Sequence, residues 1–367
     1  MMKIPLGLFF AGLLWIPGCI QNVPAEEVAD DPVRNGVRLS QLRTHAVRSI
    51  TYWRQPDQLK PRQINIGPAP PELIEFMHLD NAFQGYSERP VPVSRDSEIL
   101  RDVEAAMASL PRVIRRIAER RLFYIALVRD LGGGTGYMDV VADTDGSAAG
   151  GFIVLDEEAL DRTANAWASW REGSAFQPGT DWRIEVRNEK PKADNQVNAI
   201  RYILLHELGH VVDAVLGVTQ IGGGNTQNIA DNGFYELSWT HPPPSQTTVL
   251  PGDENRTRFD NSWPDRQQLG FYSFDASAFG IDDVPPIYEW LSETNFPTLY
   301  AASSSAEDFA ESFVNYVHVV LDQRPYEIRL LKSGQSQLLS ASCWTAPRCA
   351  DKQAVMKLLI QRAEILH

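Results

Sequence analysis

Two histidines and a glutamate between residues 206 and 210 have the types and the spacing to bind a metal ion and to use it. His206 and His210 are four residues apart, so on an α-helix they lie on one face and can hold one ion together. Glu207 follows the first histidine and can accept a proton from a metal-bound water as a general base. The alternative is a pair of surface histidines that match this spacing by chance.

The flanking residues predict the buried helix that this pair requires. Gly217 is a suitable stop at its C-terminal end. The apolar body of the helix consists of Ile200, Ile203, Leu204, Val211, Val212 and Val215. We therefore expect the two histidines on a buried helix rather than at the surface.

A third ligand must come from elsewhere, because a catalytic zinc site usually has three protein ligands and an open position for water. The chain has only 7 histidines, which favours a carboxylate. Glu307 and Glu311 are again four residues apart, on one face of a predicted helix. Glu307 would bind zinc, and Glu311 would accept a hydrogen bond from the ring of His206. The alternative is an acidic helix face exposed to solvent.

These two motifs together resemble a known family. A His-Glu-x-x-His helix at 206–210, followed much later by Glu-x-x-Ala-Glu at 307–311, is the pattern of the gluzincin zinc metallopeptidases. The form found here resembles the catalytic domain of the anthrax lethal factor and Pro-Pro endopeptidase family, over residues 100–325. The interval between the two motifs is long for this class.

The resemblance implies specific roles for the residues of the site. One zinc ion per chain would be held by His206, His210 and Glu307, and Glu311 would orient a ligand. Tyr300, seven residues before Glu307, would donate a hydrogen bond to the negative oxygen formed during amide hydrolysis. The alternative for Tyr300 is an ordinary aromatic side chain at the approach to a helix.

Three further polar residues bear on the composition of the site. Asp213 lies three residues after His210 and could orient a ligand, as in other zinc peptidases with a His-Glu-x-x-His-x-x-Asp segment. His241 could be a further polar group near zinc, but a histidine in a proline-rich loop is more often exposed. His318 follows Glu307 by eleven residues, about three helical turns, and is too far away to be a ligand.

The N-terminus resembles a bacterial lipoprotein signal. An uncharged apolar run from Ile4 to Ile16 follows Lys3 and is too short to span a bilayer comfortably. The run leads to Cys19, which we expect to carry the lipid, with ordinary signal cleavage nearby as the alternative. No aspartate follows Cys19, so the resemblance favours an outer-membrane lipoprotein that faces the periplasm or the cell surface.

The other two cysteines, Cys343 and Cys349, are close in sequence. In an oxidising compartment we expect them to form a disulfide bond. A second metal site is the alternative, but no histidine or third cysteine lies near them.

The net charge of −13, from 34 basic and 47 acidic residues, bounds the partners of the protein. It argues against nucleic acid and against an anionic membrane surface. The arginines within 112–121 are better explained as the solvated face of a helix than as a binding patch.

The predicted elements belong to an α+β fold. Strands are expected at 122–128, 137–141, 151–155 and 182–186, helices at 96–109 and 112–120, and two or three helices in the tail at 325–366. A small mixed sheet and the zinc-site helix would form one lobe, and a mainly helical second lobe would carry the third ligand. The resemblance makes this arrangement zincin-like.

We divide the chain into a signal peptide at 1–18, a flexible tether at 19–45 and a metallopeptidase domain at 46–367. Within this domain, the N-terminal lobe with the zinc helix spans 46–216, an irregular cleft wall or lid spans 217–299, and the helical lobe spans 300–367. An edge strand above the metal could pair with an extended substrate, and the strands at 137–141 and 151–155 are both candidates.

The sequence thus predicts a secreted zinc-dependent endopeptidase that hydrolyses an extracytoplasmic protein or peptide. One alternative is a metal-dependent amidase acting on cell-wall peptides. Another is a non-catalytic, zinc-stabilised envelope lipoprotein, which Glu207 disfavours because a structural site needs no base. The sequence does not fix the substrate, the oligomeric state or the presence of an inhibiting pro-segment.

Overall fold

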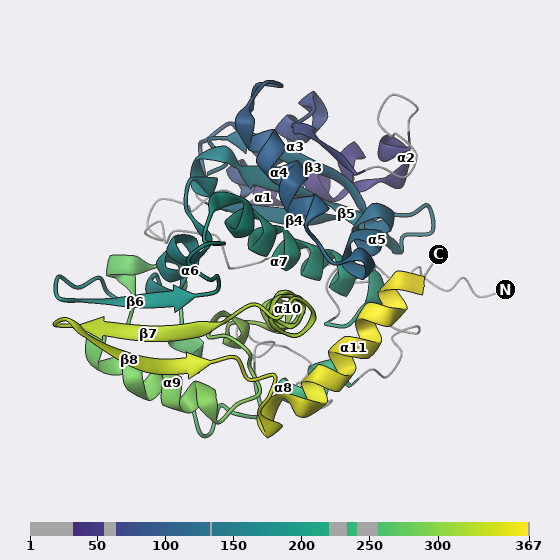
Figure 1. The fold of residues 1–367 in the computed structure, drawn as a ribbon. Helices are drawn as coiled ribbons and strands as arrows, with labels where there is room; N and C mark the ends of the chain where they lie inside the picture. The colour runs from purple at the N-terminus through teal and green to yellow at the C-terminus, as the bar shows by residue number, and fades with distance from the viewer. Residues whose placement is uncertain (1–31, 55–63, 133, 220–232, 241–255, 366–367) are drawn as a thin grey trace.

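The structure is a computed structural model that describes residues 32–54, 64–132, 134–219, 233–240 and 256–365 (Figure 1). The fold is mixed α+β, as expected, with a small mixed sheet and a separate antiparallel sheet. None of the helices in the described ranges combines the length and the apolar character needed to cross a bilayer. Cys19 lies outside these ranges.

The described helices surround both sheets. They are α1 (Pro32–Arg43), α2 (Ile50–Trp53), α3 (Pro71–Gln84), α4 (Glu98–Ala108), α5 (Arg112–Arg121), α6 (Ala164–Gly173), α7 (Gln196–Leu216), α8 (Phe234–Ser238), α9 (Val284–Ser292), α10 (Ser305–Asn315) and α11 (Ala350–Ile365). Between α7 and α10, the described residues form α8, α9 and short 3-10 turns, in the region expected to be irregular.

The first sheet is mixed, and the strands expected at 122–128, 137–141 and 151–155 all belong to it. Its strands are β1 (Asn65–Pro68), β2 (Val91–Pro92), β3 (Leu122–Arg129), β4 (Gly136–Ala142) and β5 (Ala148–Asp156). Neighbours β1, β3 and β5 are parallel, and β2 pairs antiparallel with the end of β3. Strand β4 runs antiparallel to β5 and lies at the edge of the sheet.

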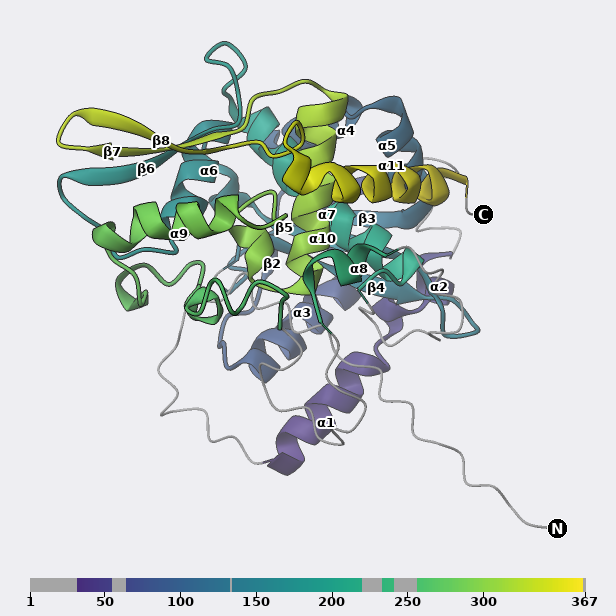
Figure 2. The same cartoon turned by 90° about the horizontal axis from the view of Figure 1, so that it is seen from below.

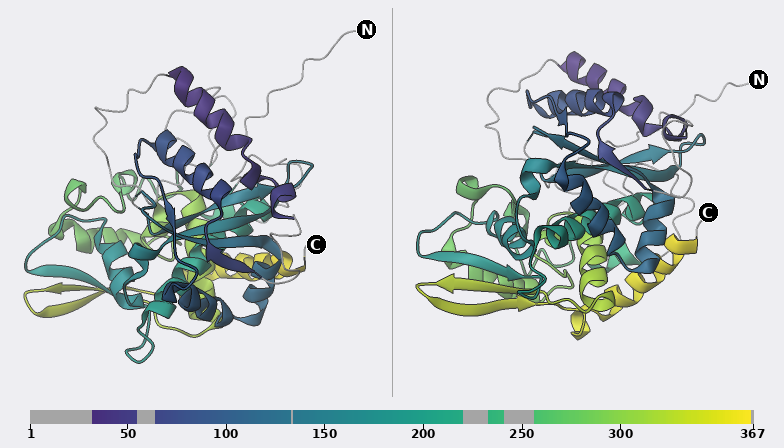
Figure 3. Two further views of the ribbon diagram at one scale, coloured as in Figure 1. Left: turned by 90° about the horizontal axis from the view of Figure 1, so that it is seen from above. Right: turned by 45° about the horizontal axis from the view of Figure 1, so that its top comes forward.

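The two faces of this sheet are buried against different helical layers, because successive side chains of a strand point to opposite sides. Ile125 and Ile153 join the larger core with α4, α5 and α7. Ala126 and Phe152 join a smaller core with α2 and α3. Figure 3 shows the strands between these layers.

The second sheet corrects the expectation of a helical tail. Its strands are β6 (Trp182–Arg187), β7 (Glu327–Lys332) and β8 (Gln335–Ala341), all antiparallel. Ser333 and Gly334 join β7 to β8 with φ angles of 50° and 79°, which a two-residue hairpin turn requires. In β7, buried Ile328 and Leu330 alternate with more exposed neighbours, the period of a strand. In the tail, α11 is helical, and β7 pairs with β6 across the expected lobe boundary.

Helix α1 occupies part of the expected tether. It lies beside α3 at the rim of the molecule (Figure 2). Arg38 Nη1 donates to the backbone oxygen of Ala82 at 3.0 Å, and Leu42 is buried. The prediction of a flexible tether is therefore wrong for residues 32–43, because this helix finds a partner in α3.

Helices α7 and α10 cross in direct contact (Figure 1). A Cβ added at Gly209 would lie 2.9 Å from Cα of Ala310, so only glycine lets the two backbones come this close. Gly209 directly precedes His210, and Ala310 lies between Glu307 and Glu311. The crossing therefore brings the two sequence motifs together.

The predicted disulfide bond is present in the loop that leads from β8 to α11. Cys343 and Cys349 are joined, with their Cα atoms 5.8 Å apart, and both are buried. Arg348 in this loop donates to the backbone oxygens of Thr294 and Phe296 at 2.7 and 3.0 Å. The loop thus ties the C-terminal elements to the segment before α10.

A buried ion pair holds α10 from another side. Nζ of Lys352 on α11 donates to both carboxylate oxygens of Asp308, at 2.7 and 2.9 Å. The indole N–H of Trp239 donates to the same carboxylate at 3.0 Å. The rings of Phe234 and Phe296 lie 5.2 and 5.0 Å from the ammonium nitrogen. Because Lys352 and Asp308 are both buried, each offsets the desolvation cost of the other.

We expect Lys352→Met to destabilise the fold by about 3–5 kcal/mol, because it leaves the buried Asp308 carboxylate without its cation. Adding Asp308→Asn should recover part of this loss, since the amide keeps an acceptor without the charge. Urea unfolding measures both variants. Equal losses in the single and double variants would contradict this role of the ion pair.

Candidate metal centre

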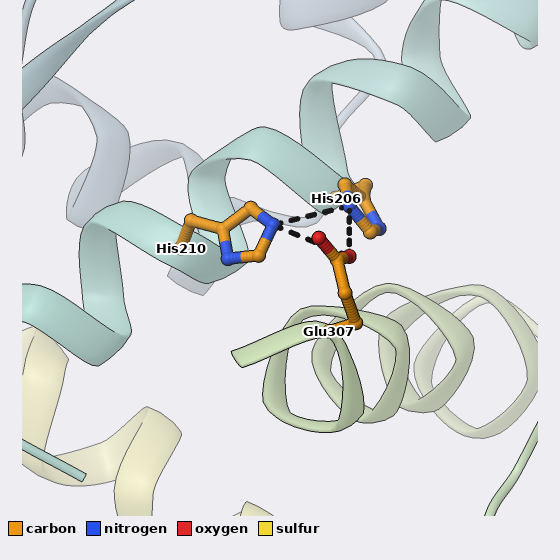
Figure 4. A group of neighbouring side chains, drawn as sticks. All are labelled: His206, His210 and Glu307. Atoms are coloured by element: carbon orange, nitrogen blue, oxygen red, sulfur yellow. Dashed lines mark hydrogen bonds and ion pairs between the residues drawn. The ribbon is translucent and has the colours of Figure 1, made fainter. Parts of the chain in front are cut away.

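Three buried ligand atoms converge where α7 and α10 cross (Figure 4). Nε2 of His206 lies 3.2 Å from Nε2 of His210. Oε2 of Glu307 lies 3.1 Å from the first nitrogen and 3.5 Å from the second. The structure thus brings together the three expected ligands from two helices that are far apart in the chain.

The arrangement fits a metal ion. Ligand atoms about 2.0–2.1 Å from one tetrahedral zinc ion lie about 3.3 Å from each other, close to the separations found here. Glu307 is 1% exposed, and among the described residues the two imidazole rings are the polar neighbours of its carboxylate. A buried carboxylate in this state is costly unless a cation binds it.

Glu311 fixes the ring of His206. Nδ1 of His206 donates to Oε1 of Glu311 at 2.8 Å, which leaves Nε2 with its lone pair towards the other two ligands. Arg171 donates to both oxygens of Glu311 at 2.8 and 3.1 Å, and the Thr298 hydroxyl donates to Oε2 at 2.7 Å. Since these donors occupy its oxygens, Glu311 is placed to orient a ligand and not to bind the ion.

The electrostatics of the site favour the ionised forms of Glu307 and Glu311 and a positive charge between these two carboxylates. Burial raises the pKa of Glu311, but Arg171 and His206 outweigh burial and hold this pKa at about 2. Burial lowers the pKa of His206, but the hydrogen bonds and charges of Glu307 and Glu311 raise it to about 10. Burial also raises the pKa of Glu307, yet the two histidines hold it well below its usual range. A bound cation would supply the positive charge in place of ring protons.

No protein-family model, curated protein or solved structure matches this chain.

Glu207 lies between the ligands and the first sheet. Burial raises its pKa, and the two histidines and a hydrogen bond from the backbone of Met138 offset part of this effect. A raised pKa suits a group that must accept a proton and return it near neutral pH. Met138 belongs to β4, so the expected general base contacts the edge strand of the sheet.

Tyr300 lies beside a ligand. It begins a 3-10 turn just before α10, and the centre of its ring is 5.7 Å from that of His206. The ring of Phe271 packs against it at 4.7 Å in an edge-on arrangement. The structure therefore places the ring of Tyr300 beside the ring of a ligand.

Asp213 does not contact a ligand through its carboxylate, contrary to expectation. Its two oxygens accept hydrogen bonds from the backbone N–H and the hydroxyl of Thr219, at 2.8 and 2.5 Å. Among the described residues, Nδ1 of His210 has no hydrogen-bond partner. Asp213 instead holds the turn after α7, because its carboxylate binds Thr219 and its backbone oxygen accepts hydrogen bonds from the N–H groups of Gly217 and Val218.

Among the described residues, His318 lies apart from the site. His318 lies in a π-helix that follows α10, and its Nε2 is 2.6 Å from the backbone oxygen of Asn188. Burial lowers its pKa to about 3, so the ring is neutral. His318 is thus remote from the ligands, as expected, and His241 lies outside the described residues.

Arg171 and Thr298 belong to the site although no sequence signal marks them. Arg171 lies on α6, 140 positions before its partner Glu311. Its sequence neighbours do not distinguish it from a charged residue on the surface of a helix. Thr298 lies 13 positions before Glu311, in an irregular segment. Neither residue belongs to a motif, so only the folded chain reveals their contacts.

Glu172, the neighbour of Arg171, is also fully buried. The hydroxyl of Tyr288 donates to its Oε1 at 2.6 Å. Its Oε2 has no hydrogen-bond partner among the described residues. Burial raises the pKa of Glu172 to about 7.

We expect Glu172→Gln to be more stable than the wild type at pH 8, by up to about 3 kcal/mol. The folded pKa of about 7 lies above the reference value of 4.5, so the unfolded chain loses its proton first. Wild-type stability therefore falls as pH rises from 4.5 to about 7 and levels off above. Urea unfolding at several pH values measures the difference, and a difference independent of pH would contradict the raised pKa.

We expect Gly209→Ala to weaken zinc binding and to lower stability by about 1–3 kcal/mol, because the new Cβ would force α7 and α10 apart. Gly173→Ala is the matched control, since a Cβ there meets no atom within 4 Å. Chelator competition measures zinc affinity, and urea unfolding measures stability. If the two variants behaved alike, the close crossing would have no role in the site.

Proposed function

We propose that this protein is a zinc-dependent endopeptidase of the gluzincin kind, with a zincin-like arrangement around its metal centre. The buried convergence of His206, His210 and Glu307 carries this proposal. A structural zinc site is usually closed by four protein ligands, whereas the described residues provide three, with Glu207 beside them. This combination supports a catalytic site.

Each residue of the centre has a separate task in the proposed reaction. When bound, zinc supplies a Lewis acid that polarises the peptide carbonyl and makes water more acidic. Glu207 takes a proton from the attacking water and later passes one to the leaving amine. Tyr300 donates a hydrogen bond to the negative oxygen that forms on the carbonyl. Glu311 keeps the Nδ1 proton on His206 and the ring in place.

We further propose that an extended substrate pairs with β4. Of the two strands considered as candidates, β5 is paired on both sides by β3 and β4, whereas β4 is at the edge. Met138 on this strand hydrogen-bonds Glu207, so a peptide added along β4 would run past the general base. Backbone pairing of this kind supplies affinity for any peptide sequence, and contacts with the substrate side chains then determine which sequences are preferred.

The proposed substrate is an extracytoplasmic protein or peptide, and the proposed location is the outer membrane, through a lipid on Cys19. The disulfide bond between Cys343 and Cys349 supports an oxidising compartment. The net charge of −13 supports a peptide substrate over nucleic acid.

We expect purified wild-type protein to contain one zinc ion per chain and to cleave unfolded protein such as casein. Glu207→Gln should keep the zinc and lose activity about 100- to 10,000-fold, because it removes only the general base. Elemental analysis and a cleavage assay measure the two properties. Glu307→Ala is the companion variant and should lose the zinc itself.

Two results would overturn the proposal at different points. A folded wild-type chain that binds no zinc would contradict the proposed metal centre. Undiminished cleavage by Glu207→Gln would contradict the proposed role of Glu207 as general base. Release of peptides from purified cell wall, without cleavage of casein, would favour the amidase instead.

A further inference from the structure

Arg171 is a buried guanidinium that lies beside the metal centre. It lies on α6 and is 2% exposed. Its Nη1 and Nη2 donate to Oε1 and Oε2 of Glu311 at 2.8 and 3.1 Å, a paired geometry that fixes the plane of the carboxylate. The orientation of Glu311 is thus set by Arg171 more than by any single-point contact.

Aromatic rings hold this guanidinium in place. Its central carbon lies 5.0 Å from the ring centre of Trp167, 5.7 Å from that of Tyr202 and 5.1 Å from that of Tyr300. A cation among three ring faces is stabilised where water cannot reach it. Because Tyr300 is one of these rings, the same side chain contacts both the expected oxyanion donor and the orienting carboxylate.

The buried charge of Glu311 depends on Arg171. Glu311 is 0% exposed, and the other donors to its oxygens are one imidazole N–H and one hydroxyl. Removing one member of a buried ion pair leaves the other uncompensated, and without the two N–H donors of Arg171 the carboxylate of Glu311 is no longer held in one plane. A displaced carboxylate would weaken the hydrogen bond to Nδ1 of His206 and would no longer fix the direction of Nε2.

We propose that Arg171 is a positioning residue for metal binding, which acts through Glu311 on the ring of His206. The proposal rests on the proposed metal centre, because it assigns Arg171 a role in holding that centre ready for the ion. Arg171 does not touch the three ligand atoms and takes no part in proton transfer. Its effect is therefore on zinc affinity first, and on turnover only as a consequence.

Zinc affinity of the full-length protein, measured by competition with a chelator, tests this role. Arg171→Met should lower the affinity about 10- to 100-fold, the range found when partners of metal ligands are removed. Arg171→Lys, which keeps the charge but not the paired geometry, should lose part of the affinity. Arg201→Met is the matched control, because it removes an equally buried arginine on α7 whose partner is Asp322 and not Glu311. It should bind zinc as the wild type does.

The double variant Arg171→Met/Glu311→Gln separates positioning from general stability. If Arg171 acts through Glu311, the double variant should bind zinc no more weakly than Glu311→Gln alone. Additive losses, or wild-type affinity in Arg171→Lys, would overturn the proposal. A wild-type protein that binds no zinc would instead contradict the proposed metal centre. Failure of the role of Arg171 and failure of the proposed function therefore give different results.

Discussion

The close crossing of α7 and α10 is the contact on which the rest of the site depends. Gly209 and Ala310 are small enough for the two backbones to touch, and the ligands lie within one helical turn on either side of that point. A larger side chain at the crossing would separate the histidines from Glu307. The first sheet packs against α7, and the Lys352–Asp308 ion pair fixes α10 to α11. Both contacts help to keep α7 and α10 at a constant separation.

Helix α10 carries three buried carboxylates, and each is neutralised from a different direction. Glu307 faces the two histidines, Asp308 faces Lys352, and Glu311 faces Arg171. Three adjacent buried charges of one sign would destabilise a helix if they shared one environment. Their separate partners lie on α7, α11 and α6. The helix that supplies the proposed third ligand is therefore held to three other helices by charged contacts.

Errors in the sequence interpretation share a physical cause. The expected helical tail contains the Ser333-Gly334 turn, whose positive φ angles form a hairpin and pair β7 with β8. Asp213 has the spacing of a ligand-orienting residue, but both of its carboxylate oxygens accept hydrogen bonds from Thr219. In both cases a local interaction decided the outcome against a pattern of spacing.

The sequence by itself determined which side chains meet at the candidate centre, because a helix places residues four apart on one face whatever surrounds it. That rule was enough for His206, Glu207 and His210 and for the pair Glu307 and Glu311, and the short interval between Cys343 and Cys349 was enough for the disulfide bond. Only the tertiary structure decided which strand is at the sheet edge and that Arg171 supports Glu311. Such contacts join residues far apart in the chain, and packing between separate elements leaves no periodic mark in the sequence.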